Sequence, residues 1–131
     1  NVVTKFIKNN FIFPNIIHNS AVVSPSAKLG QGVIVLENAV IKSMANIGDF
    51  CIINTSSVVS HNCNIGEYNH VSLGAKMGGN VRIEHNNFLG INSSLKQGII
   101  IGSNVIIGAG AVVIDNIESN VTLIGNPAKI K

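Results

Sequence analysis

The sequence predicts an all-β domain: a parallel β-helix of hexapeptide repeats with a triangular cross-section and about six coils. Three observations predict it: a hydrophobic residue at every sixth position, a small residue four positions after each of these, and a turn residue between the two. Neither the 3.6-residue period of a helix nor the two-residue period of a plain strand produces a sustained repeat of six. A fixed period of this kind is typical of proteins built from stacked structural repeats.

The hydrophobic position recurs without a break from Ile17 to Val113 and ends at Ser119. Its seventeen members are all aliphatic or Met: Ile17, Val23, Leu29, Val35, Ile41, Ile47, Ile53, Val59, Ile65, Val71, Met77, Ile83, Leu89, Leu95, Ile101, Ile107 and Val113. Since each coil can bury these side chains only against its neighbours, we expect them to form one continuous core through the stack.

The other positions of the hexad support the same fold. Four residues after the hydrophobic position, thirteen of seventeen residues are Ala, Ser, Cys or Val, which indicates a second and smaller inward position. Three residues after it, eleven of seventeen are Asn or Gly, the residues that best tolerate left-handed backbone angles. Each hexad therefore predicts one short strand and one corner, and three hexads close a coil of 18 residues whose strands stack at ~4.8 Å.

The repeats divide the chain into three parts. Residues 17–118 form the predicted β-helix, and residues 119–131 are expected to leave it and pack on its last coil. Residues 1–16 are out of period. Within them, "VVTKFIKN" (2–9) could form a short amphipathic helix and "FIF" (11–13) a strand.

The composition disfavours several partners. Only 11% of the 131 residues are charged, the formal net charge is +3, and like charges do not cluster, whereas nucleic-acid binding needs a clustered basic face. No run of 18 apolar residues predicts a membrane span. Lys5 and Lys8 interrupt any apolar leader, and Cys51 and Cys63 fit buried free thiols in a reducing compartment. We therefore expect a cytoplasmic protein.

The stretch "VVSHNCNIGEYNHV" (58–71) holds two histidines, His61 and His70, nine residues apart. Nine residues are half of an 18-residue coil, so the two imidazoles should lie on opposite sides of the prism and cannot share a site within one chain. One coil after His61 comes Gly79, and one coil before it comes Ser43. A glycine there leaves space beside the imidazole and exposes a backbone N–H that could stabilise an oxyanion. In isolation, His61 could equally be a surface turn residue.

The unbroken hexads resemble the left-handed β-helix acyltransferases, and "GNPAK" (125–129) resembles their common closing motif. The stretch "SSVVSHNCNIGEYNHVSLGAKMGGNVRI" is similar to bacterial sugar acetyltransferases that N-acetylate nucleotide-linked amino sugars or O-acetylate sialic acid. The resemblance implies a left-handed coil and a homotrimer with acetyl-CoA between chains, and no metal. It also implies a small Rossmann-like sugar-binding domain ahead of the β-helix, of which residues 1–16 would be a remnant or linker.

The resemblance implies roles for individual residues. His61 would be the general base that takes a proton from the sugar amine or hydroxyl. Histidine suits this task because its ordinary pKa lies near neutral pH. His70 would contact acetyl-CoA, and the pantetheine would pass residues of later coils: Gly79, Ile91, Gly108 and Ala109. Lys129 or Lys131 could meet a CoA phosphate. Which sugar is acetylated, and whether at nitrogen or oxygen, stays open.

The chain departs from the family at Asn62, where an acidic residue commonly follows the histidine. An acidic group would orient the ring and stabilise the imidazolium. Either the base is weaker here, or a carboxylate such as Glu67 or Asp49 takes its place.

Two other functions are possible for a β-helix of this kind. A zinc enzyme like the β-helical carbonic anhydrases could use His61, His70 and His85, but spacings of 9 and 15 put these ligands on different sides of the coil. A structural or ice-binding solenoid would need a ladder of threonines, and Thr4, Thr55 and Thr122 do not follow the hexad period.

Overall fold

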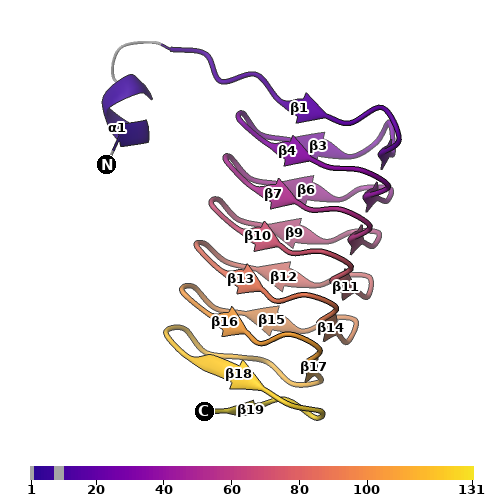
Figure 1. Cartoon of the computed structure of the whole chain (residues 1–131), viewed down its shortest axis with the longest axis vertical. Helices are drawn as coiled ribbons and strands as arrows, with labels where there is room; N and C mark the ends of the chain where they lie inside the picture. The colour runs from indigo at the N-terminus through magenta and orange to yellow at the C-terminus, as the bar shows by residue number, and fades with distance from the viewer. Residues whose placement is uncertain (1, 8–10) are drawn as a thin grey trace.

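The computed structural model describes residues 2–7 and 11–131, and from residue 16 onwards the chain winds into a stack of coils with three flat faces (Figure 1). Face A contains β1 (Ile16–Ile17), β4 (Ile34–Val35), β7 (Ile52–Ile53), β10 (His70–Val71), β13 (Phe88–Leu89), β16 (Ile106–Ile107), β18 (Thr122–Ile124) and β19 (Lys129–Ile130). Face B contains β2 (Val22–Val23), β5 (Val40–Ile41), β8 (Val58–Val59), β11 (Lys76–Met77), β14 (Ser94–Leu95) and β17 (Val112–Val113). Face C contains β3 (Lys28–Leu29), β6 (Asn46–Ile47), β9 (Asn64–Ile65), β12 (Arg82–Ile83) and β15 (Ile100–Ile101).

The strands of each face pair in parallel with a register of 18 residues. Ile34 lies opposite Ile16 and Ile52, and the same offset joins Val58 to Lys76 and Asn64 to Arg82. The predicted 18-residue coil is therefore confirmed. We name the three edges of the prism by the faces they join: the AB corner, the BC corner and the CA corner.

The corners take up the left-handed backbone conformation that the Asn and Gly pattern predicts. Every corner residue at this hexad position from residue 32 to residue 110 has a positive φ, including the larger side chains of Phe50 and Tyr68 at 56°. These two rings stack at the CA corner with centroids 5.3 Å apart, and Phe13 packs edge-on against Phe50 at 5.1 Å. Stacking of the aromatic rings helps to stabilise a conformation that bulky residues otherwise avoid.

The core consists of the two inward positions of each hexad. From Val33 to Val113 the large and the small inward side chains are all buried, and the large ones form a column through the stack. Four of the small inward residues are polar: Ser57, Asn69, Asn87 and Ser93. The Asn69 amide donates to the carbonyls of Gly66 and Glu84, and the side-chain oxygens of Asn69 and Asn87 accept from backbone N–H groups of the next coil. Hydrogen bonding offsets the cost of burying Asn69, whereas the buried amide nitrogen of Asn87 has no partner among the described residues.

The two ends of the chain depart from the repeat. The expected N-terminal helix is present as α1 (Val2–Ile7), and residues 8 and 9 of that expectation lie outside the described residues. The expectation of a strand at "FIF" (11–13) was wrong. Among the described residues this segment pairs with no strand; it contacts the first coil through the Phe13 carbonyl, which accepts from the Gly32 N–H, and the side chain of the nearby Asn15 bonds to Gly30 and Val33.

The last coil is shorter than the others. Its partners are 16 residues apart, as in Ile101 with Ile117 and Ile106 with Thr122, and β19 turns back antiparallel to β18. Leu123 is buried beneath this final turn and covers the end of the core. In the described part of the chain, no helix has the length and apolarity needed to cross a bilayer.

We predict that Ile53→Ala lowers the free energy of unfolding by about 2–5 kcal/mol, because it leaves a cavity between coils. Ile53 has no exposed surface, whereas Ile100 points outwards from face C and is 43% exposed. The matched variant Ile100→Ala should cost less than about 1 kcal/mol. Chemical denaturation measures both values, and equal losses would contradict the assignment of inward and outward positions.

Candidate active site at the BC corner

His61 and Gly79 are stacked neighbours at the BC corner, as the 18-residue period predicts. The backbone N–H of Asn80 donates to the His61 carbonyl at 3.0 Å, and the N–H of Asn62 donates to the Ser43 carbonyl at 3.0 Å. Three consecutive coils therefore place Ser43, His61 and Gly79 in one column, with His61 between β8 and β9.

The imidazole of His61 lies directly against Gly79. A Cβ added to Gly79 would lie 2.5 Å from Nε2 and 3.0 Å from Nδ1 of the ring, so any larger residue would displace it. Within the described residues, the Gly79 N–H donates to no acceptor of the chain. The corner thus presents an imidazole nitrogen and an available backbone donor side by side.

Asn62 fixes the tautomer of the His61 ring. Its side-chain oxygen lies 3.0 Å from Nδ1. Because an amide oxygen can only accept, Nδ1 carries the proton and Nε2 keeps its lone pair. The left-handed conformation of Asn62, with φ of 59°, belongs to the corner itself. A corner residue therefore also orients the His61 ring.

The expectation that Glu67 or Asp49 replaces the missing acidic neighbour of His61 was wrong. Asp49 accepts two hydrogen bonds from Gln31, and Glu67 lies at the CA corner, at the other end of face C. In residues 2–7 and 11–131, the contacts between a histidine and a carboxylate are those of His18 with Glu37 and of His85 with Glu84, each at 3.9 Å. The partner of His61 is the neutral amide of Asn62.

His70 lies on face A, opposite the BC corner, and is half-buried. Its ring packs edge-on against Phe88 with centroids 5.2 Å apart, and its Nε2 lies 3.0 Å from the amide nitrogen of Asn54. The Asn54 oxygen already accepts from the N–H of Thr55 at 2.7 Å, so the amide nitrogen donates to His70. Burial lowers the pKa of His70, which favours a neutral ring with its proton on Nδ1.

The remaining residues predicted to bind the cosubstrate lie in a third place, the AB corner. The N–H of Gly110 donates to the Ile91 carbonyl at 2.7 Å, which stacks Ile91 with the coil of Gly108 and Ala109. One chain therefore brings His61 together with Gly79, and Ile91 together with Gly108 and Ala109. It does not bring these two groups together with each other or with His70.

The histidines do not converge on a metal site. His61 lies at the BC corner, His70 on face A and His85 at the CA corner, and the described residues contain no group of three His, Cys, Asp or Glu side chains that could hold an ion. The cysteines are free and buried. Burial raises the pKa of Cys51 to about 11 and also raises the pKa of Cys63, so neither thiol is an activated nucleophile.

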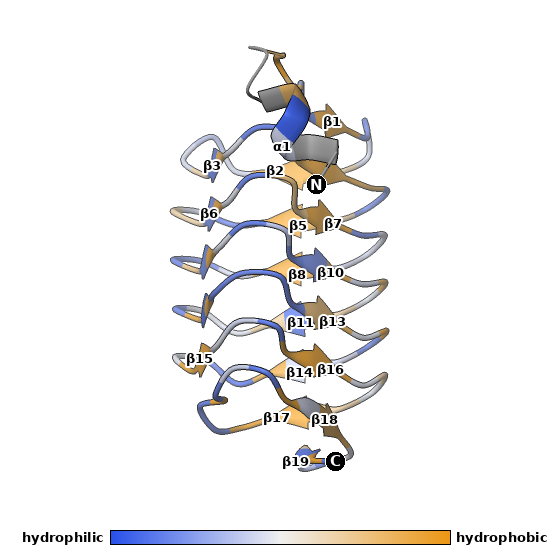
Figure 2. Ribbon diagram, turned by 90° about the vertical axis from the view of Figure 1, so that its left-hand side faces the viewer, coloured by the Kyte–Doolittle hydropathy of each residue, from blue (hydrophilic) through white to orange (hydrophobic). Residues whose placement is uncertain are grey.

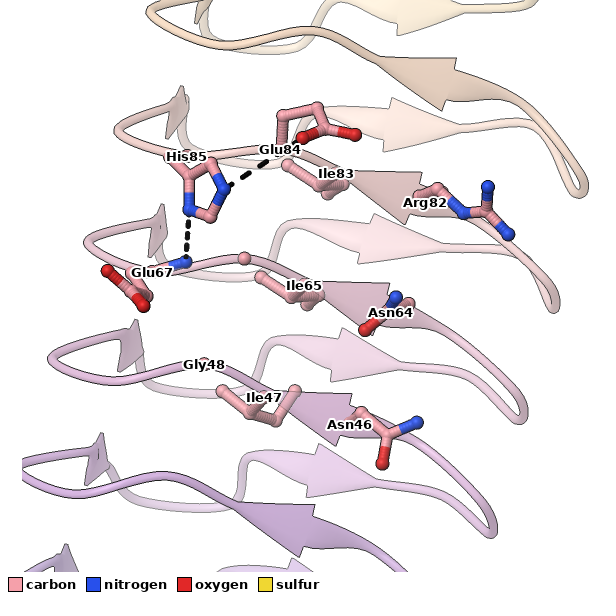
Figure 3. Close-up of a pocket in the computed structure, with 11 residues that line it drawn as sticks. Asn46, Ile47, Gly48, Asn64, Ile65, Glu67, Arg82, Ile83, Glu84 and His85 are labelled. Atoms are coloured by element: carbon pink, nitrogen blue, oxygen red, sulfur yellow. Dashed lines mark hydrogen bonds and ion pairs between the residues drawn. The ribbon is translucent and has the colours of Figure 1, made fainter.

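Sequence reasoning missed a hollow of about 340 Å³ on face C (Figure 3). Asn46, Asn64 and Arg82 line one side of it, each one coil from the next, and Glu84 and His85 line the other. A signal was available, because Arg82 is the single arginine of the chain and follows Gly79 by three residues.

We predict that His70 makes folding less favourable as the solution becomes acidic. Its pKa lies below the reference value of 6.5 in the folded chain, so below that pH the unfolded chain binds a proton that the folded chain resists. The free energy of unfolding should therefore fall as pH drops below 6.5, and it should fall less steeply in His70→Gln. Denaturation curves across this range test it, and identical slopes for both proteins would refute it.

The comparisons with known proteins agree with this geometry. A family model described as bacterial transferase hexapeptide (six repeats) matches residues 80–115. A search among curated proteins finds no match. Perosamine N-acetyltransferase from Caulobacter crescentus, solved as a histidine-to-asparagine variant in complex with CoA and GDP-perosamine, is 40% identical with a TM-score of 0.97, over 99% of this chain and 62% of that one.

Two further structures are similar over the same region. The acetyltransferase domain of PglB from Neisseria gonorrhoeae, in complex with acetyl coenzyme A, is 37% identical with a TM-score of 0.97, over 99% of this chain and 63% of that one. WeeI from Acinetobacter baumannii AYE is 32% identical with a TM-score of 0.95, over 99% of this chain and 64% of that one. This chain spans 62–64% of the length of these structures. The fold recognised in the sequence is confirmed: the chain is a left-handed β-helix that contains the bacterial transferase hexapeptide repeat and is similar along its length to bacterial sugar acetyltransferases.

Proposed function

We propose that this β-helix carries out acetyl transfer from acetyl-CoA to an amino or hydroxyl group of a nucleotide-linked bacterial surface sugar. The observation that carries the proposal is the BC corner, where the free Nε2 of His61 lies beside the available N–H of Gly79. Similar structures were solved with CoA and GDP-perosamine and with acetyl coenzyme A, which supports the same pair of substrates here. No metal takes part in the proposed reaction.

The corner supplies two groups to the reaction, for which acetyl-CoA provides an activated thioester. Nε2 of His61 accepts the proton of the amine or hydroxyl as that group attacks the thioester carbonyl. The Gly79 N–H donates to the carbonyl oxygen, where negative charge develops. The new C–N or C–O bond forms, the C–S bond breaks, and the proton held by His61 passes to the departing thiolate. No cysteine is needed as a nucleophile.

We propose a homotrimer because one chain separates the predicted site residues. The outward residue of most strands on faces A and B is apolar, whereas that of most strands on face C is polar. The apolar strands are β4, β7, β13 and β16 on face A and β2, β5, β8 and β17 on face B. Figure 2 shows the ribbon of β5, β7, β8 and β13 in the hydrophobic colour. Face A of one chain packing on face B of the next would close a ring and direct the AB corner, with exposed Leu73 and Ile91, towards the threefold axis. It would also bring His61 of one chain towards His70 of its neighbour.

Acetyl-CoA would then lie between two chains. His70 presents a fixed Nδ1–H donor on face A, Gly79 presents its N–H at the BC corner, and Ile91, Gly108 and Ala109 offer backbone and apolar contacts to the pantetheine. Lys129, exposed on β19, or Lys131 would meet a CoA phosphate. Free thiols and a CoA substrate support a cytoplasmic enzyme.

The division of the chain follows the same proposal. Residues 17–118 are the acetyl-transfer β-helix, and residues 119–131 close its last coil. Residues 1–16 connect it to a sugar-binding domain.

We predict that His61→Ala lowers kcat/KM at least about 100-fold, because it removes the proton acceptor. Gly79→Ala should lower kcat at least about tenfold without unfolding the protein, because the added methyl group displaces the His61 ring. The control is His18→Ala, an exposed histidine outside the proposed site. Acetyl transfer is measured by release of CoA thiol with the acceptor-binding domain present. Activity of His61→Ala within a few-fold of the wild type would refute the role of His61.

We predict that inactive His61→Ala and His70→Ala chains regain activity when they are unfolded and refolded together. In mixed trimers, about a quarter of the interfaces would combine an intact His61 with an intact His70 from the neighbouring chain. Each variant refolded alone is the control. If the mixture stays as inactive as its components while both variants assemble normally, the site is not shared between chains in this way.

A further inference from the structure

We propose that the hollow on face C holds the anionic group of the acceptor sugar, with Arg82 as its binding residue. This inference rests on the proposed function, because it places the acceptor relative to His61. The ligand class is a sugar that carries a phosphate or a carboxylate.

The hollow offers a column of hydrogen-bond donors. Asn46, Asn64 and Arg82 open strands β6, β9 and β12, and all three side chains point away from the core (Figure 3). Parallel pairing puts each of them one coil from the next, at ~4.8 Å along the stack. Two amides and a guanidinium at this spacing suit a ligand with several oxygen atoms.

Arg82 has no anionic partner among the described residues. The nearest acidic side chain in sequence, Glu84, has its carboxylate 3.9 Å from Nε2 of His85, and His85 in turn accepts from the Glu67 N–H at 3.0 Å. Figure 3 shows Glu84, His85 and Glu67 on the side of the CA corner, with Arg82, Asn64 and Asn46 on the strand side. The guanidinium is therefore available for the paired hydrogen bonds that phosphate and carboxylate groups accept.

The carboxylates at the other side of the hollow fit the same ligand. Glu84 and Glu67 would repel a second anion but can accept hydrogen bonds from hydroxyl groups. A sugar that carries one anionic group has both kinds of group. The hollow is thus polar at both ends, and the two ends differ in the sign of their charge.

The hollow adjoins the proposed catalytic corner on the same two coils. Asn64 follows His61 by three residues, and Arg82 follows Gly79 by three residues, so the two pairs occupy equivalent positions of successive coils. Three residues span at most roughly 10 Å of chain. An acceptor whose amine or hydroxyl lies at Nε2 of His61 can therefore reach Arg82 with a group attached to the far side of the sugar ring.

The test compares Arg82→Gln and Arg82→Lys with a matched control, Lys28→Gln. Lys28 is a cation in the same outward position of face C, on β3, and does not line the hollow. Three acceptors are assayed with the acceptor-binding domain present: GDP-perosamine, sialic acid and perosamine without its nucleotide. Acetyl transfer gives kcat and KM for each, and calorimetry gives binding of each acceptor without turnover.

We expect Arg82→Gln to raise KM and Kd for a charged acceptor about tenfold, which corresponds to about 1.4 kcal/mol, with kcat and the KM of acetyl-CoA changed less than about threefold. Arg82→Lys should recover part of the loss, because it keeps the charge without the planar fork. An effect confined to GDP-perosamine identifies the phosphate as the anion, and one confined to sialic acid identifies the carboxylate. Lys28→Gln should leave all three acceptors unchanged, and Arg82→Gln should leave perosamine without its nucleotide, which has no anionic group, unchanged.

Unchanged KM and Kd in Arg82→Gln for both anionic acceptors would overturn the inference, as would an equal loss for perosamine without its nucleotide. The two proposals can fail separately. Arg82-dependent binding without any acetyl transfer would retain the anion site and refute the proposed function. Acetyl transfer that depends on His61 but not on Arg82 would support the proposed function and refute the anion site.

Discussion

Backbone hydrogen bonding between successive coils, whose paired residues lie 18 positions apart, is the constraint on which the rest of the structure depends. Donor–acceptor distances along this ladder lie near 2.9 Å, as for Ile34 with Cys51 and Val58 with Ala75. Strands of two residues have no stability of their own, so each coil is held by the coils on either side. The same ladder arranges side chains in columns, and each column is a row of neighbours that sequence spacing identifies.

The proposed chemistry uses these columns directly. A glycine one coil after His61 removes the side chain that would otherwise cover the imidazole, and leaves the ring against backbone. The neutral amide of Asn62 replaces the acidic neighbour usual in the family and still selects the tautomer with a free Nε2. On the opposite face, Asn54 orients His70 in the same way, with the proton on the other nitrogen. Two histidines thus become an acceptor and a donor through the amides beside them.

The fold was largely predictable from the sequence because each position of the hexad determines whether a side chain points inwards or outwards. The period of six specified which residues point inwards, which turn a corner and which lie one coil apart, and so it placed Gly79 on His61. It did not reveal the shortened last coil, because residues after Val113 lose the period. The prediction of a strand at residues 11–13 was wrong, because these residues lie outside the period and contact the first coil through a hydrogen bond at Phe13 rather than through a ladder.

The hydrogen bonds between side chains could not be predicted from the spacing of residues in the sequence. The bond from Asn54 to His70 crosses 16 residues rather than 18, and the bond from Asn62 to His61 depends on rotamers that a sequence does not specify. Arg82 stands out in the sequence as the single arginine, but only the fold shows that no described carboxylate is paired with it. His61 and His70 lie at different places on the prism, so the proposed trimer does not follow from the spacing within one chain.

A crystal structure of the protein with its acceptor-binding domain, acetyl-CoA and acceptor would test the central claim most directly. The account predicts the thioester carbonyl within hydrogen-bond distance of the Gly79 N–H, the acceptor nucleophile at Nε2 of His61, and His70 of the adjacent chain on the cosubstrate. A thioester bound away from the BC corner, with His61 facing solvent and no neighbouring chain beside it, would contradict the account.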